Sequence, residues 1–275
     1  MPQADDTNPF RTNLIVGTHH KSGTMWMQAS LRAMAKMGGF AYLRYRRSLK
    51  LNDSLPQLVV ERKGVLLRFE ENSYIRQEDL DKATVVHVVR DPRDMLVSAT
   101  HYHQKATEKF LLRPWADLTG TSTYKDHISS LPSFEEKLMF EMGAYTGKVF
   151  SEMMRWPYGA EAHHELHYED LMADTEMTIF RGILDGAGLT PDEVETCLQA
   201  LWNNSLFGGL ATKESQGKVR YEGTNHIRSG TAQQWVSSFT PTIAEAFRER
   251  YQPLLERYGY ETDDSWVEKV AKPKQ

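Results

Sequence analysis

The amino-acid sequence predicts an α/β fold of the three-layer type, in which a parallel β-sheet is flanked by helices. Apolar runs of strand length alternate along the chain with segments of helical periodicity, which is typical of parallel α/β sheets. The run TVVHVVR at 84–90 is apolar almost throughout, as expected of a strand that is buried on both faces. In addition, the strand expected at 13–18 leads through a short polar turn into a helix expected at 22–37.

The other elements follow in chain order. GVLLRF at 64–69 is expected to form a second strand, and AHHELHY at 162–168 a further one. The segment 91–106 is expected to be helical, because Asp91 suits the N-cap position and Pro92 the first helical position. Further helices are expected at 134–156, 174–187, 191–202 and 241–258, and loops at 42–53, 110–133 and 208–228.

Composition limits the class of protein. With 275 residues and no visible linker, we expect a single domain over 1–275 with a core at about 13–260. The formal net charge of −4 argues against a dedicated nucleic-acid binder, and no apolar run is long enough to span a membrane. The N-terminus lacks a signal-peptide core, and the single cysteine, Cys197, has no partner for an intramolecular disulfide. We therefore expect a cytoplasmic enzyme without nucleic-acid or membrane partners, and the oligomeric state stays open.

The turn after the first strand has the composition of an anion-binding loop. Residues 18–26 read THHKSGTMW, whereas in nucleotide triphosphatases the lysine follows the second glycine. Backbone N–H groups at 22–25 would open the following helix and, together with its dipole, attract a tetrahedral anion. Lys21 adds a mobile positive charge, and Ser22 and Thr24 add hydroxyl donors. Residues 18–26 are referred to below as the anion loop.

The anion loop resembles the phosphosulfate loop of sulfotransferases that use 3′-phosphoadenosine 5′-phosphosulfate (PAPS). The family pattern is roughly Tyr-Pro-Lys-Ser-Gly-Thr-Thr-Trp, and in this chain Met25 replaces the second threonine and His20 the proline. The resemblance implies that the loop binds the cosubstrate. Besides Met25, the binding residues that it implies are Lys21, Ser22, Gly23, Thr24 and Trp26.

A second segment carries the same resemblance. The family has an arginine at the end of a strand and a serine eight residues later, and this pair holds the 3′-phosphate of the cosubstrate. Arg90 and Ser98 stand at these positions. A guanidinium offers a fork of donors that suits phosphate oxygens, and a hydroxyl adds one more.

Two further regions resemble the family. Tyr168 in LHYEDL matches a tyrosine that contacts the nucleotide, and Phe207 in NNSLFGGL matches, after a one-residue slip, an aromatic that packs on adenine. HIRSGTAQQWVSSFTP at 226–241 resembles the family's Arg-Lys-Gly segment and the Asp-Trp and Phe-Thr pairs that follow it. Its implied cosubstrate residues are Arg228, Ser229 and Gly230. Because Ser229 stands where lysine is usual, the 3′-phosphate site has one positive charge fewer.

The resemblance implies a sulfotransferase on a P-loop-like nucleotide-binding architecture, with PAPS as cosubstrate and no metal. The acceptor would be a hydroxyl or amine of a small molecule or sugar, and Lys21 would stabilise the leaving phosphate. Many relatives carry Lys-Thr-His after the second strand, where this chain has Arg68, Phe69 and Glu70. Glu70 is therefore the expected general base. The rival bases are Glu71, His101 and His103.

Two other classes of function stay open at this point. A kinase-like P-loop enzyme would need lysine after the second glycine and an acidic Mg²⁺ ligand after a strand. A non-catalytic nucleotide-binding protein would keep the pocket and lack a working base. A zinc site in HHELH at 163–167 would have His163, Glu165 and His167 on one strand face, but no cysteine or distant third ligand is evident.

The acceptor is not identified by the sequence. Its binding residues are expected in the segments 40–63, 106–133 and 208–227. Aromatic side chains there would suit an apolar pocket, and would equally suit a core. They are Tyr42, Tyr45, Phe110, Trp115 and Tyr124.

Overall fold

The computed structural model describes residues 10–45, 64–71, 83–114, 122–157, 162–210 and 232–270. Contacts along the chain divide it into two compact units. Unit 1 comprises Met1–Val89 and Trp156–Val219, and unit 2 comprises Arg90–Arg155 and Arg220–Gln275. Each unit is described by itself below, and the expectation of a single domain stays a prediction.

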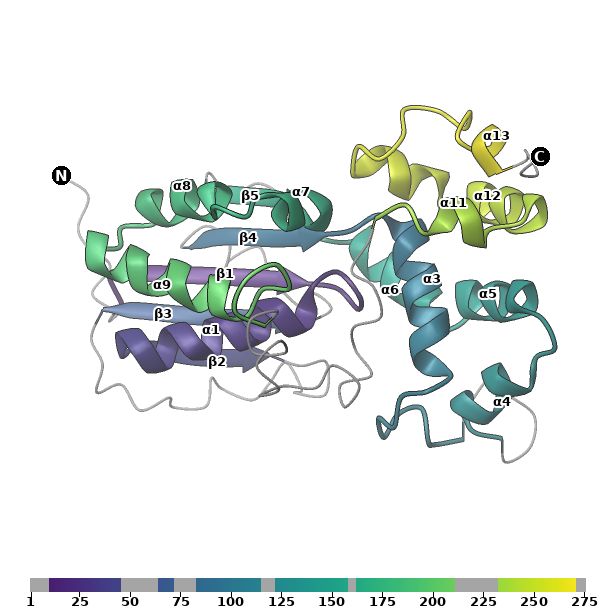
Figure 1. The fold of residues 1–275 in the computed structure, drawn as a ribbon, viewed down its shortest axis with the longest axis horizontal. Coiled ribbons are helices and arrows are strands. Elements are labelled where there is room, and N and C mark those ends of the chain that lie inside the picture. The colour runs from purple at the N-terminus through teal and green to yellow at the C-terminus, as the bar shows by residue number, and fades with distance from the viewer. Residues whose placement is uncertain are drawn as a thin grey trace. The chain divides into compact units, whose positions relative to one another are not determined.

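Unit 1 contains a five-stranded parallel sheet with the strand order β2-β3-β1-β4-β5 (Figure 1). This confirms the predicted α/β fold with its parallel sheet, and all four predicted strands are present within two residues of their expected ends. The central strand β1 lies between β3 and β4, so both of its neighbours are reached by crossover connections. The strands are β1 (Thr12–Thr18), β2 (Ala41–Tyr45), β3 (Val65–Glu71), β4 (Thr84–Val89) and β5 (His163–His167).

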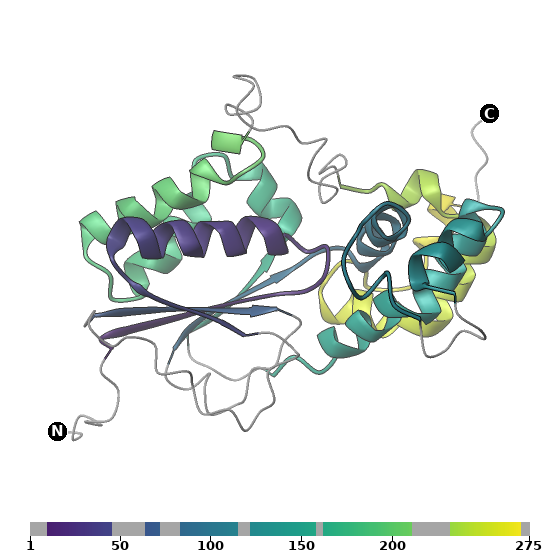
Figure 2. The same ribbon diagram turned by 90° about the horizontal axis from the view of Figure 1, so that it is seen from below.

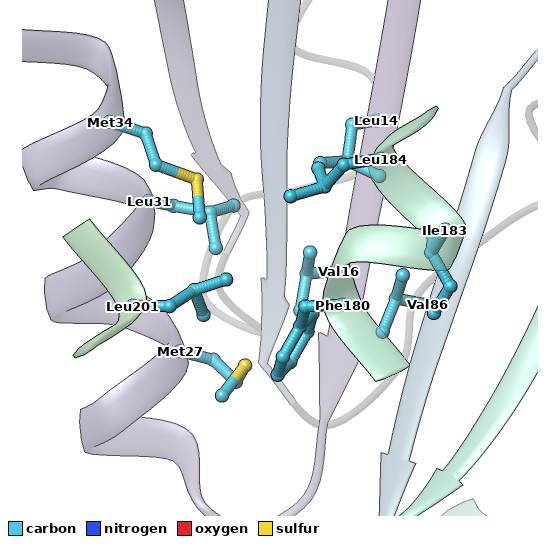
Figure 3. A pocket seen from close by; sticks show the side chains of 10 residues that line it. All are labelled: Leu14, Val16, Met27, Leu31, Met34, Val86, Phe180, Ile183, Leu184 and Leu201. Carbon is cyan, nitrogen blue, oxygen red and sulfur yellow. The ribbon is translucent and has the colours of Figure 1, made fainter. Parts of the chain in front are cut away.

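Helices of unit 1 pack on one face of this sheet, as Figure 2 shows for the purple α1 and the green helices. Leu14 and Val16 of β1 point toward the helices, and a small space there is lined by ten side chains of carbon and sulfur only (Figure 3). We interpret it as core packing, because no polar group lines it. The helices are α1 (Thr24–Gly38), α7 (Tyr168–Ala173), α8 (Thr178–Gly186) and α9 (Pro191–Asn203).

The opposite face of the sheet carries the alternate residues of each strand, because successive side chains in a strand point to opposite faces. Ile15 and Val85 form a small apolar cluster there with Trp156. Gly17 leaves room for the indole: a Cβ atom at this position would lie 2.2 Å from Trp156 Cη2. A side chain at Gly17 is therefore incompatible with the observed position of the tryptophan.

Unit 2 is helical in the residues that the structure describes. At the start of α3, Arg93 binds Asp91 and Glu261 and lies over the rings of Trp235 and Trp266, at 3.9 and 4.9 Å. This side chain thus joins the N-terminus of α3 to the C-terminal segment. The helices are α3 (Pro92–His103), α4 (Tyr124–Ser130), α5 (Phe134–Gly143), α6 (Tyr145–Met153), α11 (Trp235–Ser238), α12 (Pro241–Arg257) and α13 (Val267–Val270).

Three expectations about local structure were wrong. The basic segment 42–53 was expected to be a loop, but its first residues complete β2, which pairs with β3 in register. The region 110–133 was expected to be a surface loop, but it contains the helix α4, whose Tyr124 is fully buried. The helix expected at 134–156 breaks at Ala144, where the backbone leaves the helical region and Thr146 N–H instead donates to the buried Glu141 side chain.

The close contact at Gly17 gives a stability prediction. Gly17→Ala should lower the free energy of unfolding by about 1–3 kcal/mol, the usual cost of overpacking a rigid core, because the added methyl overlaps the indole of Trp156. Urea unfolding of both proteins measures this. Gly182→Ala in α8 is the matched control, since its Cβ meets nothing within 4 Å. Equal stability of Gly17→Ala and the control would show that Trp156 does not pack on β1.

Candidate active site

The anion loop has a backbone shape that few residues adopt. Lys21 has φ 71° and Gly23 has φ 98°, so both lie in the left-handed region. For a residue with a Cβ such as Lys21 this conformation costs energy, and such strain is found most often at functional sites. Alternation of right- and left-handed residues turns successive N–H groups toward one side and forms a concave anion-binding surface.

The two hydroxyl groups of the anion loop hold its shape from within. Ser22 is fully buried; its hydroxyl accepts from His19 N–H at 2.9 Å and lies 3.0 Å from the acceptor carbonyls of His19 and Val88. Thr24 Oγ1 donates to His19 O at 2.8 Å and lies 3.1 Å from Thr18 Oγ1. The Ser22 hydroxyl therefore anchors the loop to the end of β4, and the Thr24 hydroxyl binds within the loop. The backbone amides are the groups suited to an anion.

The N-terminus of α1 is suited to a negative ligand. Its N-cap residue, Gly23, makes no side-chain cap hydrogen bond, and its first turn contains no acidic residue. In contrast, α3 is capped by Asp91 and α9 by Thr190 in a capping box. The first N–H groups of a helix have no partner within it and carry the positive end of the dipole. An anion bound at the loop would complete this helix end.

Three aromatic side chains predicted at the cosubstrate lie around the start of α1. The ring of Tyr168 faces Gly23, because a Cβ there would lie 3.1 Å from Tyr168 Cδ2. Trp26 is turned into the core: its Nε1–H donates to Leu201 O at 3.0 Å, and Phe207 meets the indole edge to face at 5.8 Å. The structure thus brings the anion loop and the segments around Tyr168 and Phe207 together within unit 1. Met25 is exposed.

The predicted 3′-phosphate pair lies in unit 2. Arg90 follows β4 directly and is buried, and Ser98 is half-buried on α3. The guanidinium of Arg90 lies 3.8 Å from Asp94, whose other oxygen accepts Trp235 N–H at 3.0 Å. Asp94 therefore links the Arg90 segment to the C-terminal segment that resembles the family. Arg228, Ser229 and Gly230 lie outside the described residues.

Glu70, the expected base, is 1% exposed near the end of β3. Its carboxylate accepts a hydrogen bond from Arg68 Nε. In the sheet register Gly17 is flanked by Glu70 on one side and His87 on the other. Glu70 therefore lies on the sheet face opposite the helices, one strand away from β1, which leads into the anion loop.

The rival bases have other contacts. Glu71 pairs with Arg44 at 2.5 Å. In unit 2, His101 stacks on Phe134, and His103 is fully buried with Nδ1 2.9 Å from Glu141.

The buried Glu141 carboxylate is stabilised by several groups. Burial by itself would raise the pKa of Glu141, but His103 and the hydroxyls of Thr146 and Tyr124 lower it overall.

The aromatic residues considered for the acceptor lie in different places. Tyr124 and Phe110 belong to a small apolar core of unit 2. Tyr42 packs against the core of unit 1, Tyr45 lies in β2, and Trp115 is outside the described residues.

A buried group of histidines next to the anion loop was not predicted from the sequence. His19 Nε2 lies 2.8 Å from His87 Nε2, and His87 Nδ1 lies 3.1 Å from Glu165. The ring of His87 stacks on Trp156 at 3.8 Å, and Trp156 Nε1–H donates to His163. The HHELH run suggested only a zinc motif, and the described residues contain no group of three or more ligands suited to a metal.

Burial controls the charge of these histidines. The pKa of His19 is held well below its ordinary value, chiefly because burial disfavours the imidazolium and also because His87 would repel it. The pKa of His163 is likewise lowered by burial, against the opposing attraction of Glu165. Both rings are therefore neutral at neutral pH.

Comparison with known proteins agrees with this arrangement. A model of the sulfotransferase domain matches residues 11–259. "Sulfotransferase 2A6" of Rattus norvegicus is 27% identical over 264 residues, which cover 88% of this chain and 84% of the relative. "3-beta-hydroxysteroid sulfotransferase" of Cavia porcellus is 23% identical over 265 residues, or 89% of this chain and 84% of the relative.

A solved structure has a similar fold. The mouse sulfotransferase SULT7A1 complexed with PAP aligns with a TM-score of 0.55 and 15% identity, covering 94% of this chain and 87% of that one. No helix among the described residues combines the length and apolarity needed to cross a bilayer. The match of the domain model to nearly the whole described chain, together with the anion loop at the start of α1, shows that the chain belongs to the sulfotransferase domain family and is a transferase of that class.

Proposed function

We propose that this enzyme transfers a sulfuryl group from PAPS to a hydroxyl or amine of a small-molecule acceptor. The observation that carries the proposal is the anion loop, in which Lys21 and Gly23 adopt left-handed conformations just before an uncapped helix. A phosphosulfate is an anion of tetrahedral groups, and free amides at a helix N-terminus bind such groups well. The mouse relative of similar fold is complexed with PAP, which is the desulfated product of PAPS.

Lys21 is proposed to stabilise the leaving phosphate. During transfer the bond between sulfur and the bridging oxygen of PAPS breaks, and negative charge develops on the 5′-phosphate. Preorganised donors aimed at this charge lower the barrier more than donors that bind the ground state equally well. Lys21 supplies a full positive charge, and the amides of residues 23–25 supply the fixed dipoles, because the Ser22 N–H already donates to His19 O.

Several other residues are proposed to bind the nucleotide. Arg90 and Ser98 would hold the 3′-phosphate, with Arg228, Ser229 and Gly230 contributing from the C-terminal segment. Tyr168 and Phe207 would contact the nucleoside, and this is supported by their positions beside Gly23 and Trp26. Ser229 provides a hydroxyl where relatives provide a charge, so Arg90 and Arg228 would carry most of the attraction for the 3′-phosphate.

Glu70 is proposed as the general base. It would take the proton from the acceptor hydroxyl while the acceptor oxygen bonds to sulfur, so the products are a sulfate ester, PAP and the protonated carboxyl. Its burial and its contact with Arg68 fix the side chain in place. A base held rigidly within reach of the acceptor contributes typically about 10²–10⁴-fold to rate.

The acceptor is proposed to be an alcohol with an apolar body, and hydroxysteroids are the first class to screen. This class is placed first because the Cavia porcellus relative is named a 3-beta-hydroxysteroid sulfotransferase. The alternative functions are a kinase-like P-loop enzyme and a nucleotide-binding protein without turnover. The kinase-like enzyme is disfavoured because Lys21 precedes Gly23. The binding protein is distinguished from the sulfotransferase by measuring turnover.

Donor binding is tested by thermal unfolding with added nucleotide. PAP at about 100 times its Kd should stabilise the protein by roughly 2.7 kcal/mol, because it binds only the folded chain. ATP at the same concentration is the control, since it lacks the 3′-phosphate that Arg90 and Ser98 are proposed to hold. Stabilisation by ATP with Mg²⁺ and none by PAP would reject the proposed donor and favour the kinase-like alternative.

The role of Lys21 is tested by Lys21→Met, which keeps the length of the side chain and removes its charge. We expect kcat to fall by about 10²–10³-fold, as for loss of one transition-state donor, with a smaller change in the Kd of PAP. Lys36 near the C-terminus of α1 is the matched control, and Lys36→Met should leave kcat unchanged. If the kcat of Lys21→Met stays within a factor of about three of the parent value, the fall is far smaller than the loss of a transition-state donor causes. The charge stabilisation would then be assigned to other groups.

The base is tested by Glu70→Gln, which keeps size and hydrogen bonding but cannot accept the proton. Turnover should fall by at least about 10²-fold, while PAP still protects the protein from heat. Glu71→Gln is the neighbouring control and should retain most of the activity, because Glu71 is paired with Arg44. Full activity of Glu70→Gln would exclude Glu70 and direct attention to the histidines.

A further inference from the structure

A hydrogen-bonded chain of three ionisable residues runs across the sheet to the anion loop. Glu165 lies on β5, His87 on β4 and His19 directly after β1. The contacts are 3.1 Å from Glu165 to His87 Nδ1 and 2.8 Å from His87 Nε2 to His19 Nε2. Both histidines are 0% exposed. We refer to these three residues as the histidine relay.

The contacts determine which nitrogens carry protons when both histidines are neutral and Glu165 is ionised. A carboxylate only accepts, so His87 donates from Nδ1 and its Nε2 is an acceptor. His19 must then donate from its own Nε2, which leaves Nδ1 of His19 with a lone pair. This Nδ1 atom is buried and has no hydrogen-bond partner among the described residues. The relay in this state has a net charge of −1, from Glu165.

His19 is also the residue on which the anion loop is built. Its carbonyl accepts from the N–H of Ser22 and from the hydroxyl of Thr24, and its N–H donates to the Ser22 hydroxyl. The imidazole therefore belongs to a residue of the anion loop, and the backbone of this residue directly contacts Ser22 and Thr24. A bound donor with several negative charges would act strongly on it, because charges interact more strongly at a buried site than in water.

We propose that the histidine relay couples donor binding to the uptake of one proton at Nδ1 of His19, and so compensates negative charge beside the anion loop. This inference rests on the proposed PAPS chemistry. The proton comes from the solvent, and the relay changes from a net charge of −1 to zero: an imidazolium balanced by Glu165. The hydrogen bonds of the chain survive, because the added proton occupies the nitrogen that has a lone pair.

The low proton affinity of His19 in the free protein suits this role. Its pKa is held well below the ordinary value by burial and by His87, so the site is empty of a proton until an anion arrives. Other titratable or permanently charged groups lie on the same sheet face or in the anion loop. They are Arg68 and Glu70 on β3, His163 on β5, and His20 and Lys21 in the anion loop.

The role of the relay is electrostatic and distinct from that of Glu70. Glu70 is proposed to take the acceptor's proton, whereas the relay would already be protonated when the donor is bound. A positive imidazole near the leaving phosphate stabilises charge that grows in the transition state. His19, His87 and Glu165 are thus positioning and charge-compensating residues for the donor loop.

The test is calorimetric titration of the enzyme with PAP at neutral pH in several buffers that differ in ionisation enthalpy. The slope of binding enthalpy against buffer enthalpy gives the number of protons taken up. His19→Asn should take up fewer protons than the parent, by up to one, and its affinity for PAP should depend less on pH. If binding takes up one proton, the Kd of the parent enzyme for PAP should rise by up to about tenfold for each unit of increasing pH. The Kd of His19→Asn should rise less over the same pH range. Comparing the two proteins cancels the ionisation of PAP itself.

Two further variants test the relay independently if His19→Asn alters the conformation of the anion loop. His87→Phe retains a ring against Trp156 but separates His19 from Glu165, so proton uptake should fall by at least half. His164→Gln removes the neighbouring histidine of β5, which lies on the other face of the strand, and should not change the uptake. Circular dichroism and urea unfolding check that each variant is folded.

The outcomes separate this inference from the proposed function. Ordinary PAP binding with the same proton uptake in the parent, His19→Asn and His87→Phe would overturn the relay and leave the donor assignment intact. No detectable binding of PAP to the parent enzyme would overturn the donor assignment, and the relay proposal with it. The relay proposal would be supported if proton uptake on PAP binding is reduced in His19→Asn and His87→Phe and is unchanged in His164→Gln.

Discussion

The site depends on the conformation of the short turn between β1 and α1. Two left-handed residues, Lys21 and Gly23, turn the chain so that the first amides of α1 are not used by any side-chain cap. The loop retains this shape because its hydroxyls bind inward, to the carbonyls of His19 and Val88. The strain at Lys21 is thus offset by buried hydrogen bonds, and the donors suited to an anion are backbone groups whose positions do not depend on side-chain motion.

The sheet has two chemically different faces, and this difference allows a buried polar site next to a well-packed core. Leu14 and Val16 face the helices, while Gly17 on the other face has Glu70 and His87 as its register neighbours. The missing side chain at Gly17 admits Trp156, which stacks on His87 and shields it from water. Polar groups buried in this way must bind one another, since an unpaired buried polar group is costly.

Parts of the fold and site were predictable because local patterns specify them. The apolar run of β4 and the polar turn after β1 identified a parallel sheet and an anion loop, and the structure confirms the sheet. The edge strand β2 and the helix α4 were not predicted, because basic and polar residues in their neighbourhood resemble loop sequence. Their state depends on pairing with β3 and on the burial of Tyr124, which are interactions with distant parts of the chain.

The sequence by itself determined the class of fold, the location of the anion loop and the segments that resemble a sulfotransferase, because these depend on residue order and short spacings. Only the tertiary structure decided that the hydroxyls of Ser22 and Thr24 turn inward and that Trp26 is a core residue. It also brought together His19, which directly follows β1, His87 of β4 and Glu165 of β5, which are separated by up to 146 positions, from 19 to 165. The physical reason is that register across a parallel sheet is set by the packing of all its strands, and no local pattern encodes which side chains become neighbours across it.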